Sequence, residues 1–154
     1  MFSRNQLHFI DFKLTSPESQ REDWYVVTHY IAEFWCCISN IGFLIVCYSF
    51  GFHQKTYPIL AAAICSILSH AIPLQIFLLL DKAAMILAIF SYLHLWRQLW
   101  FFVPILFAVN QTDMYLARQF GYTWPHVLWH LIAAFLAYVT ATHEIVTLQQ
   151  ENRI

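Results

Sequence analysis

Long apolar runs separated by short polar or proline-containing breaks make up most of this chain. Five runs can be placed, at residues 31–52, 57–71, 78–96, 99–116 and 125–148. Pro58 and Pro125 each stand in the first turn of a run, where a helix tolerates proline, and Pro73 ends the second run. Because a bilayer core takes about 20 mostly apolar residues per helix, the pattern predicts an all-α membrane protein, a bundle of about five transmembrane helices.

Two regions are more polar than the rest. The fourth run contains Pro104, and its second half turns polar from Asn110 onward. Residues 1–28 form a polar N-terminal segment that lacks the order of charged, apolar and small residues seen in a signal peptide. The sequence has no internal repeat and no low-complexity linker, so a single domain over residues 1–154 is the simplest interpretation.

The composition supports the membrane interpretation. Of the 154 residues 60% are hydrophobic and 11% are charged, whereas a typical soluble domain has about 25% charged residues. The net charge of -1 gives no electrostatic reason to expect nucleic acid, so the lipid bilayer is the expected partner. The four cysteines lie inside apolar runs without metal-ligand spacing, and we interpret them as small buried hydrophobes.

Five polar residues interrupt the apolar runs close to their ends. Ser66 and His70 are four residues apart, as are His126 and His130, so each pair shares one face of its helix. Asp81 stands near the start of the third run. If all five runs cross the membrane, all five residues reach the same side of the bilayer. If the fourth run does not cross, the last two histidines fall on the opposite side.

Each of these residues also has a plain structural interpretation. His70 can be a polar residue near the interface, Ser66 a small packing residue, and Asp81 a partner for the lysine that follows it. The pair His126 and His130 is a stronger indication, since histidines four apart on a helix can share one metal ion. A carboxylate in apolar surroundings costs roughly 3 kcal/mol on insertion scales and usually pairs or functions. Together the five residues favour a metal site formed by the histidines and assisted by the polar side chains of Ser66 and Asp81.

Three separated blocks of the chain resemble the alkaline ceramidases. The first block is Tyr30-Ile31-Ala32-Glu33-Phe34-Trp35 followed by Ser39-Asn40. The second is Ser66 with His70, then Leu79-Leu80-Asp81 and Met85. The third is His126 followed by Trp129-His130. The blocks occur in the order in which the family carries them.

The resemblance implies a fold related to the seven-helix bundle of that family and an intramembrane zinc hydrolase. It implies that ceramide is cleaved at its amide bond to a sphingoid base and a free fatty acid. His70, His126 and His130 are then expected to bind zinc and leave a fourth position for water. Asp81 is expected to orient that water or move its proton, and Ser66 to hydrogen-bond the developing oxyanion. The expected location is an ER or Golgi membrane if the source is eukaryotic.

The chain departs from the family pattern in three ways. It has room for five helices instead of seven, which would remove part of the wall around the acyl chains. Lys82 stands where the family usually carries an acidic residue. The resemblance also implies a calcium site at Asp23, Trp24 and Glu33, but the further acidic and asparagine ligands are missing. Since calcium takes six to eight oxygen ligands, the sequence does not favour calcium regulation.

Two alternatives to a hydrolase remain open. The first is a catalytically silent, shortened homologue with a structural or receptor-like role. The missing helices favour it, and the retention of all five site residues opposes it. The second is a haem-binding bundle in which histidines are the axial ligands. A Soret band in purified protein would reveal bound haem. Haem ligation by the histidines does not explain Ser66 and Asp81.

Overall fold

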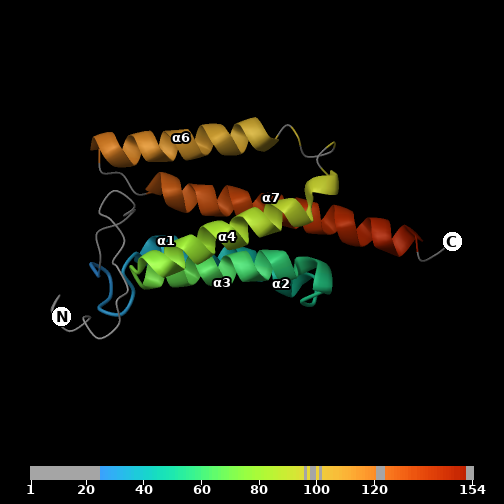
Figure 1. The fold of residues 1–154 in the computed structure, drawn as a ribbon, viewed down its shortest axis with the longest axis horizontal. Coiled ribbons are helices and arrows are strands. Elements are labelled where there is room, and N and C mark those ends of the chain that lie inside the picture. Colours follow the sequence, from blue (N-terminus) through green and yellow to red (C-terminus); the bar gives the residue numbers. More distant parts are fainter. Residues whose placement is uncertain (1–24, 96, 98–99, 101, 121–123, 152–154) are drawn as a thin grey trace.

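A computed structural model describes residues 25–95, 97, 100, 102–120 and 124–151 of the protein. Within these ranges the regular structure is helical, which confirms the all-α prediction. The elements in chain order are α1 (Phe34–Ser39), α2 (Ile41–Ser49), η2 (Gln54–Thr56), α3 (Tyr57–Ala71), α4 (Gln75–Ser91), η3 (Leu93–Leu95), α6 (Phe102–Phe120) and α7 (Trp124–Glu151). The helices lie side by side with their long axes in one general direction (Figure 1).

Each of the five predicted runs contains a helix, and the prolines mark two of the boundaries as expected. Pro58 is in the first turn of α3. Ile72, which ends this helix, has the extended conformation (φ -126, ψ 110) that a following proline imposes. The third run was predicted to begin near residue 78, but α4 already begins at Gln75, because the chain turns within the three residues from Ile72 to Leu74. Asp81 consequently lies in the second turn of α4.

One helix in the described part of the chain is long and apolar enough to cross a membrane. This helix is α7, which has 28 residues, and its most apolar window has a mean hydropathy of 1.6. Residues Phe34–Ser49, which hold α1 and α2, form a shorter apolar helix. With 15 and 17 residues, α3 and α4 are about 22–26 Å long, whereas a bilayer core is about 30 Å thick. Length and composition therefore support one membrane crossing.

Packing between helices brings the end of α3 and the start of α7 to α1. α3 packs against α4, and α6 packs against α7, while α1 and α2 contact both α3 and α7 (Figure 1). Val46, Cys47, Ile59 and Ala141 form the buried cluster that joins α2, α3 and α7. Gly42 permits the close approach of α2 to α7, because a Cβ atom at this position would lie 3.0 Å from the Cβ of Ala134.

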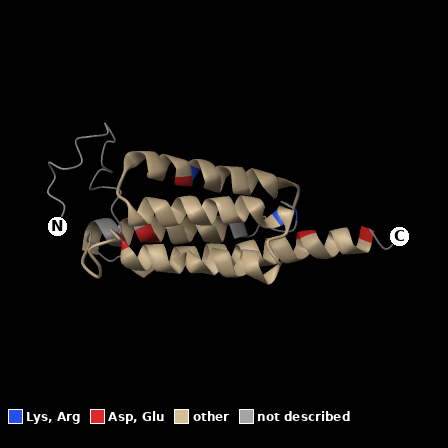
Figure 2. Cartoon of the chain, turned by 90° about the horizontal axis from the view of Figure 1, so that it is seen from below, with Lys and Arg blue, Asp and Glu red and all other residues tan. Residues whose placement is uncertain are grey.

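Apolar side chains are exposed along the helices. α4 has no buried residue, and the exposed side chains on it include Leu79, Leu87, Ile89 and Phe90. Figure 2 shows that charged residues are few along the ribbon. Soluble monomers rarely expose contiguous apolar patches larger than a few hundred Å². The surface is therefore suited to apolar surroundings.

Candidate metal centre

Three histidine rings meet where α3 ends and α7 begins. The ring centroids of His70 and His126 are 5.2 Å apart, those of His70 and His130 are 5.1 Å apart, and those of His126 and His130 are 4.6 Å apart. His126 and His130 share one face of α7 because they are four residues apart. The structure thus brings the three predicted zinc ligands together, and we call them the histidine cluster.

The segment before α1 is tied to the end of α3 by two backbone hydrogen bonds. The amide of Ala32 donates to the carbonyl of Ala71 at 3.0 Å, and the amide of Glu33 donates to the carbonyl of His70 at 2.9 Å. These bonds place the Glu33 carboxylate beside the His70 ring, with Oε2 2.6 Å from Nδ1. Glu33, a predicted calcium ligand, therefore orients His70. The other two predicted calcium ligands, Asp23 and Trp24, lie outside the described residues.

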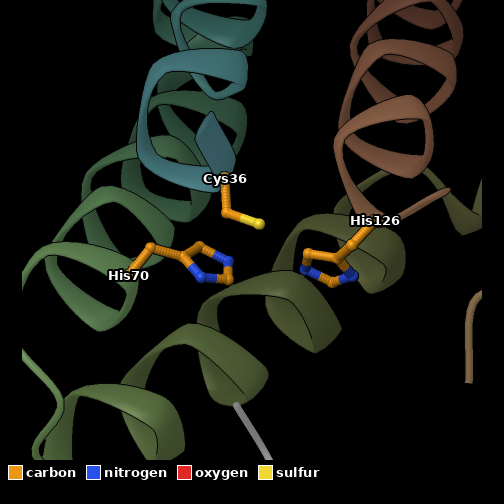
Figure 3. A group of neighbouring side chains, drawn as sticks. All are labelled: Cys36, His70 and His126. Carbon is orange, nitrogen blue, oxygen red and sulfur yellow. The ribbon is translucent and has the colours of Figure 1, made fainter. Parts of the chain in front are cut away.

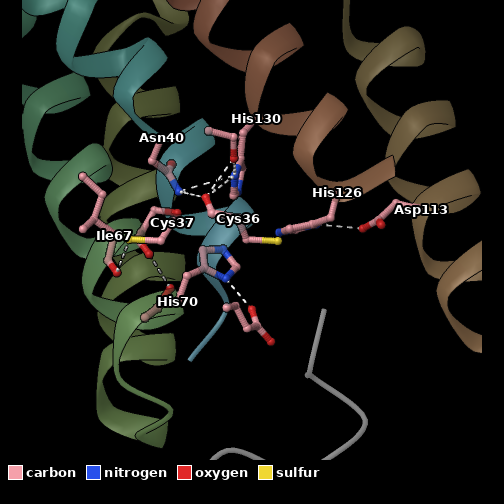
Figure 4. Close-up of polar contacts among 12 residues, drawn as sticks. Cys36, Cys37, Asn40, Ile67, His70, Asp113, His126 and His130 are labelled. Atoms are coloured by element: carbon pink, nitrogen blue, oxygen red, sulfur yellow. Dashed lines mark hydrogen bonds and ion pairs between the residues drawn. The ribbon is translucent and has the colours of Figure 1, made fainter. Parts of the chain in front are cut away.

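The other two rings are also held at Nδ1. Asp113 of α6 is fully buried, and its Oδ2 lies 2.8 Å from Nδ1 of His126. Nδ1 of His130 lies 2.7 Å from the Ser39 hydroxyl and 3.1 Å from the carbonyl oxygen of Cys36 (Figure 4). Metal-binding histidines commonly use one ring nitrogen for the metal and the other for such a partner. If the rings bind a metal in this way, the ligand atoms are the Nε2 atoms.

Cys36 is a further candidate ligand. Its thiol and ring nitrogens of His70 and His126 all lie within 4.8 Å of one another. Figure 3 shows the sulfur atom directed toward the space between the two rings. This group could hold a metal ion. This differs from the sequence-based interpretation of Cys36 as a small buried hydrophobe, because an apolar run without paired ligand spacing does not reveal which cysteine faces the histidines.

The spacing of the rings fits the dimensions of a tetrahedral metal site. A nitrogen about 2.0 Å from zinc places the centre of its ring roughly 3.2 Å from the metal, and tetrahedral angles then separate the ring centres by about 5 Å. The three observed separations lie between 4.6 and 5.2 Å. The ring separations match those of one tetrahedral site, but the group whose ligand atoms already lie within 4.8 Å of one another is Cys36, His70 and His126, and the His130 ring would have to approach it to complete a three-histidine site.

Ser66 and Asp81 lie beside His70. Ser66 is buried and precedes His70 by one turn of α3. The Asp81 carboxylate on α4 lies within reach of hydrogen bonds from the hydroxyl groups of Ser66 and Ser69, and the charges of the His70 ring and Lys82 act on it. Both predicted assisting residues are therefore adjacent to the histidine cluster, and Lys82 is only one of several partners of Asp81.

A second buried carboxylate lies toward the other end of α7. One oxygen of Glu144 is 2.7 Å from Nζ of Lys55, and the other is 2.7 Å from Nε2 of His94. The hydroxyl of Tyr92 donates to the backbone carbonyl of Lys55. We call Lys55, His94 and Glu144 the Glu144 cluster. No sequence motif marks this cluster, because its members are far apart in the chain.

Comparison of the chain with protein-family models, curated proteins and solved structures finds no match. The resemblance to the alkaline ceramidases therefore rests on the three sequence blocks. The residues of those blocks meet in the structure at the histidine cluster: Glu33 and Ser39 come from the first, Ser66, His70 and Asp81 from the second, and His126 and His130 from the third.

Proposed function

We propose that this chain is an intramembrane zinc-dependent amidohydrolase that cleaves ceramide to a sphingoid base and a free fatty acid. The observation that carries the proposal is the geometry of the histidine cluster. Three rings stand at the separations that a tetrahedral site requires, and a polar group holds Nδ1 of each ring. Buried structural histidines also need partners for their ring nitrogens, so the convergence of the rings carries more weight than the hydrogen bonds at Nδ1.

Charge gives a second argument for a divalent cation. The carboxylates of Glu33 and Asp113 are buried against His70 and His126, with carboxylate side-chain exposures of 7% and 0%. Buried charges are costly unless they are paired or coordinate metals. Neutral carboxyl groups, protonation of both histidines or a divalent cation between the rings would each remove the cost of the two buried charges. A cation leaves the imidazoles neutral, which is the form that binds metal.

The residues around the proposed metal have distinct roles. Zinc held by the three histidines would supply a Lewis acid that brings the pKa of water toward 7. Glu33 and Asp113 keep two of the rings in the required tautomer and orientation. Asp81 accepts a proton from the attacking water and returns it to the leaving sphingoid amine. Ser66 donates a hydrogen bond to the oxyanion that develops on the amide carbonyl.

We further propose that the chain crosses the membrane several times, as an ER or Golgi protein if its source is eukaryotic. The exposed apolar side chains on α4 and the other helices support this arrangement. Along α7, Glu144 is about 21 Å from His130 and about 27 Å from His126, a separation that reaches at most the thickness of an ER bilayer core, about 27 Å. The shorter helices would be accommodated by local thinning of the bilayer.

The two alternative functions are affected differently by the structure. A catalytically silent homologue keeps the metal centre and differs only in turnover, so it is the second candidate. The position of Cys36 beside the histidine cluster favours the silent homologue, because a thiolate bound to the metal can close the site to water. A haem protein does not fit the geometry, because rings in edge contact at 4.6–5.2 Å leave no space for a porphyrin between axial ligands.

Hydrolysis of ceramide by purified protein tests the function. Wild-type protein in detergent micelles is expected to release fatty acid, and Asp81→Asn is expected to lower the rate by about 10²–10⁴-fold, as for loss of a general acid or base. Glu151→Gln at the exposed end of α7 is the control and should retain wild-type activity. Zinc-loaded wild type that releases no fatty acid would support the silent homologue, and full activity of Asp81→Asn would contradict the role of Asp81.

Thiol labelling at two loops tests the number of crossings. Gln54→Cys precedes α3 and Ile72→Cys follows it, and both positions are exposed. If α3 crosses the bilayer, a membrane-impermeant thiol reagent should label the two positions from opposite sides of sealed vesicles. Labelling of both from the same side would mean that α3 does not cross the bilayer.

A further inference from the structure

We infer that the thiolate of Cys36 is a ligand of the metal held by the histidine cluster. In this arrangement Cys36 takes the fourth position, which the proposed hydrolysis requires for water, and the resting site is closed. The inference rests on the proposed metal centre. It adds a donor of this chain that neither the sequence pattern nor the predicted ligand set includes.

The position of Cys36 supports direct ligation. Its side chain is fully buried in α1. Its sulfur shares a group within 4.8 Å with ring nitrogens of His70 and His126. Around zinc, sulfur at about 2.3 Å and nitrogen at about 2.0 Å would be roughly 3.5 Å apart. Side-chain rotations that close the group by about 1 Å would therefore complete the site.

The backbone of Cys36 is held at the third histidine. Its carbonyl oxygen lies 3.1 Å from Nδ1 of His130 and accepts a hydrogen bond from the side-chain Nδ2 of Asn40 at 2.9 Å. Asn40 is fully buried. Cys36 therefore faces His70 and His126 with its thiol and His130 with its backbone carbonyl.

The neighbouring Cys37 provides a comparison within the same turn of α1. Its thiol points to α3, where the sulfur lies 3.8 Å from the carbonyl oxygen of Ile67 (Figure 4). Both cysteines are buried, yet only Cys36 belongs to the group that could hold a metal. Cys37 is therefore a matched control for substitutions at Cys36.

Thiolate ligation has a defined chemical balance and a functional consequence. The thiol proton leaves as the sulfur–metal bond forms, so metal binding releases one proton to the solvent. No oxidant or reductant takes part. Three imidazoles and one thiolate fill a tetrahedral site, and closed four-coordinate zinc sites are structural, whereas catalytic sites keep one position open. Hydrolysis then requires Cys36 to leave the metal, and removal of the thiol should increase the rate.

Cobalt substitution tests the ligand directly, because Co²⁺ takes the same ligands as zinc and reports on them by absorption. Wild type and Cys37→Ala loaded with Co²⁺ are expected to show a thiolate-to-cobalt charge-transfer band in the near ultraviolet. Cys36→Ala should lose this band and keep the visible bands of a cobalt–histidine site. Cys36→Ser has a side chain of similar size, so it removes the thiolate with less risk to folding than Cys36→Ala. It should also lack the band.

The possible outcomes separate this inference from the proposed function. Wild type that binds cobalt without the charge-transfer band, or a band that persists in Cys36→Ala, would overturn the inference and leave the histidine site intact. Wild type that binds no cobalt would overturn both. Faster ceramide hydrolysis by Cys36→Ala than by Cys37→Ala would support the closed resting site, whereas an unchanged or slower rate would overturn it.

Discussion

The two polar clusters along α7 use similar residues in different arrangements. In the histidine cluster, the rings of His70 and His126 are nearly buried, with side-chain exposures of 10% and 12%, and each of these two rings faces its own carboxylate. In the Glu144 cluster, one carboxylate faces two cationic groups, and these are more exposed, at 39% for Lys55 and 54% for His94. A histidine–carboxylate pair occurs in both clusters, so the pair alone does not indicate a metal site.

The two clusters differ in how their charges are balanced and in whether their rings converge on one space. Glu144 already has a lysine partner, so its negative charge is balanced within the cluster. The histidine cluster has two buried carboxylates and three rings that converge on one space, and a divalent cation would complete its charge balance. We therefore interpret the first cluster as a metal centre and the second as a structural link between η2, η3 and α7.

The largest effect is expected from removal of a metal ligand. His130→Ala should abolish ceramide hydrolysis, because two imidazoles and a thiol would no longer form the catalytic site. His143→Ala removes an exposed histidine from the same helix and should keep wild-type activity. Fatty-acid release measures both variants. Substantial hydrolysis by His130→Ala would remove the distinction between the two clusters.

A smaller effect is expected from loss of the oxyanion donor. Ser66→Ala should lower the rate of hydrolysis by about 100-fold, the typical cost of one such hydrogen bond. It should keep the zinc, since Ser66 is not a ligand. The control is Ser91→Ala, which removes an exposed hydroxyl from α4. If Ser66→Ala loses its zinc, the residue supports the metal centre and does not act on the substrate.

Residues that orient the rings should affect metal affinity. Asp113→Asn and Glu33→Gln are each expected to weaken zinc binding by about 10–100-fold, because the ligand rings lose their carboxylate partners. Thr112→Ala, beside Asp113 on an exposed side of α6, should leave affinity unchanged. Competition with a chromophoric chelator measures these affinities. Wild-type affinity in both carboxylate variants would mean that they do not support the metal ligands.

The smallest effect on the metal is expected at the other end of α7. Glu144→Gln should keep wild-type zinc content while it lowers stability by about 1–3 kcal/mol, the range for hydrogen bonds to charged groups. Glu151→Gln, which is exposed, should melt like wild type. Thermal unfolding in detergent compares the two. Loss of zinc from Glu144→Gln would contradict the separate roles of the two clusters.

Much of the fold follows from local signals in the sequence. Prolines at positions 58 and 73 and the apolar runs predict where helices begin and end, because the backbone restriction of proline acts on its immediate neighbours. The proximity of the three histidine rings follows from sequence spacing for His126 and His130, which share a helix face, whereas the approach of His70 depends on helix packing. The early start of α4 at Gln75 was missed because no cap residue marks it.

The contacts between distant residues could not be predicted from local pattern. Cys36 resembles the other buried cysteines in the sequence, and only the packing of α1 against α3 and α7 distinguishes it. Asp113 lies in a polar stretch that does not reveal which side chain turns inward. Lys55 and Glu144 are 89 residues apart in the chain. Such pairs depend on helix packing, which hydrophobic periodicity does not determine.

Metal analysis of purified protein tests the central claim most directly, because it requires no assumption about the substrate. Zinc is measured per chain in detergent-purified wild type, in His126→Ala and in the control His143→Ala. We expect about one zinc per chain in wild type and in the control, and much less in His126→Ala, because this variant loses one imidazole ligand of the metal. Folded wild-type protein without zinc, or His126→Ala with the wild-type amount, would contradict the metal centre.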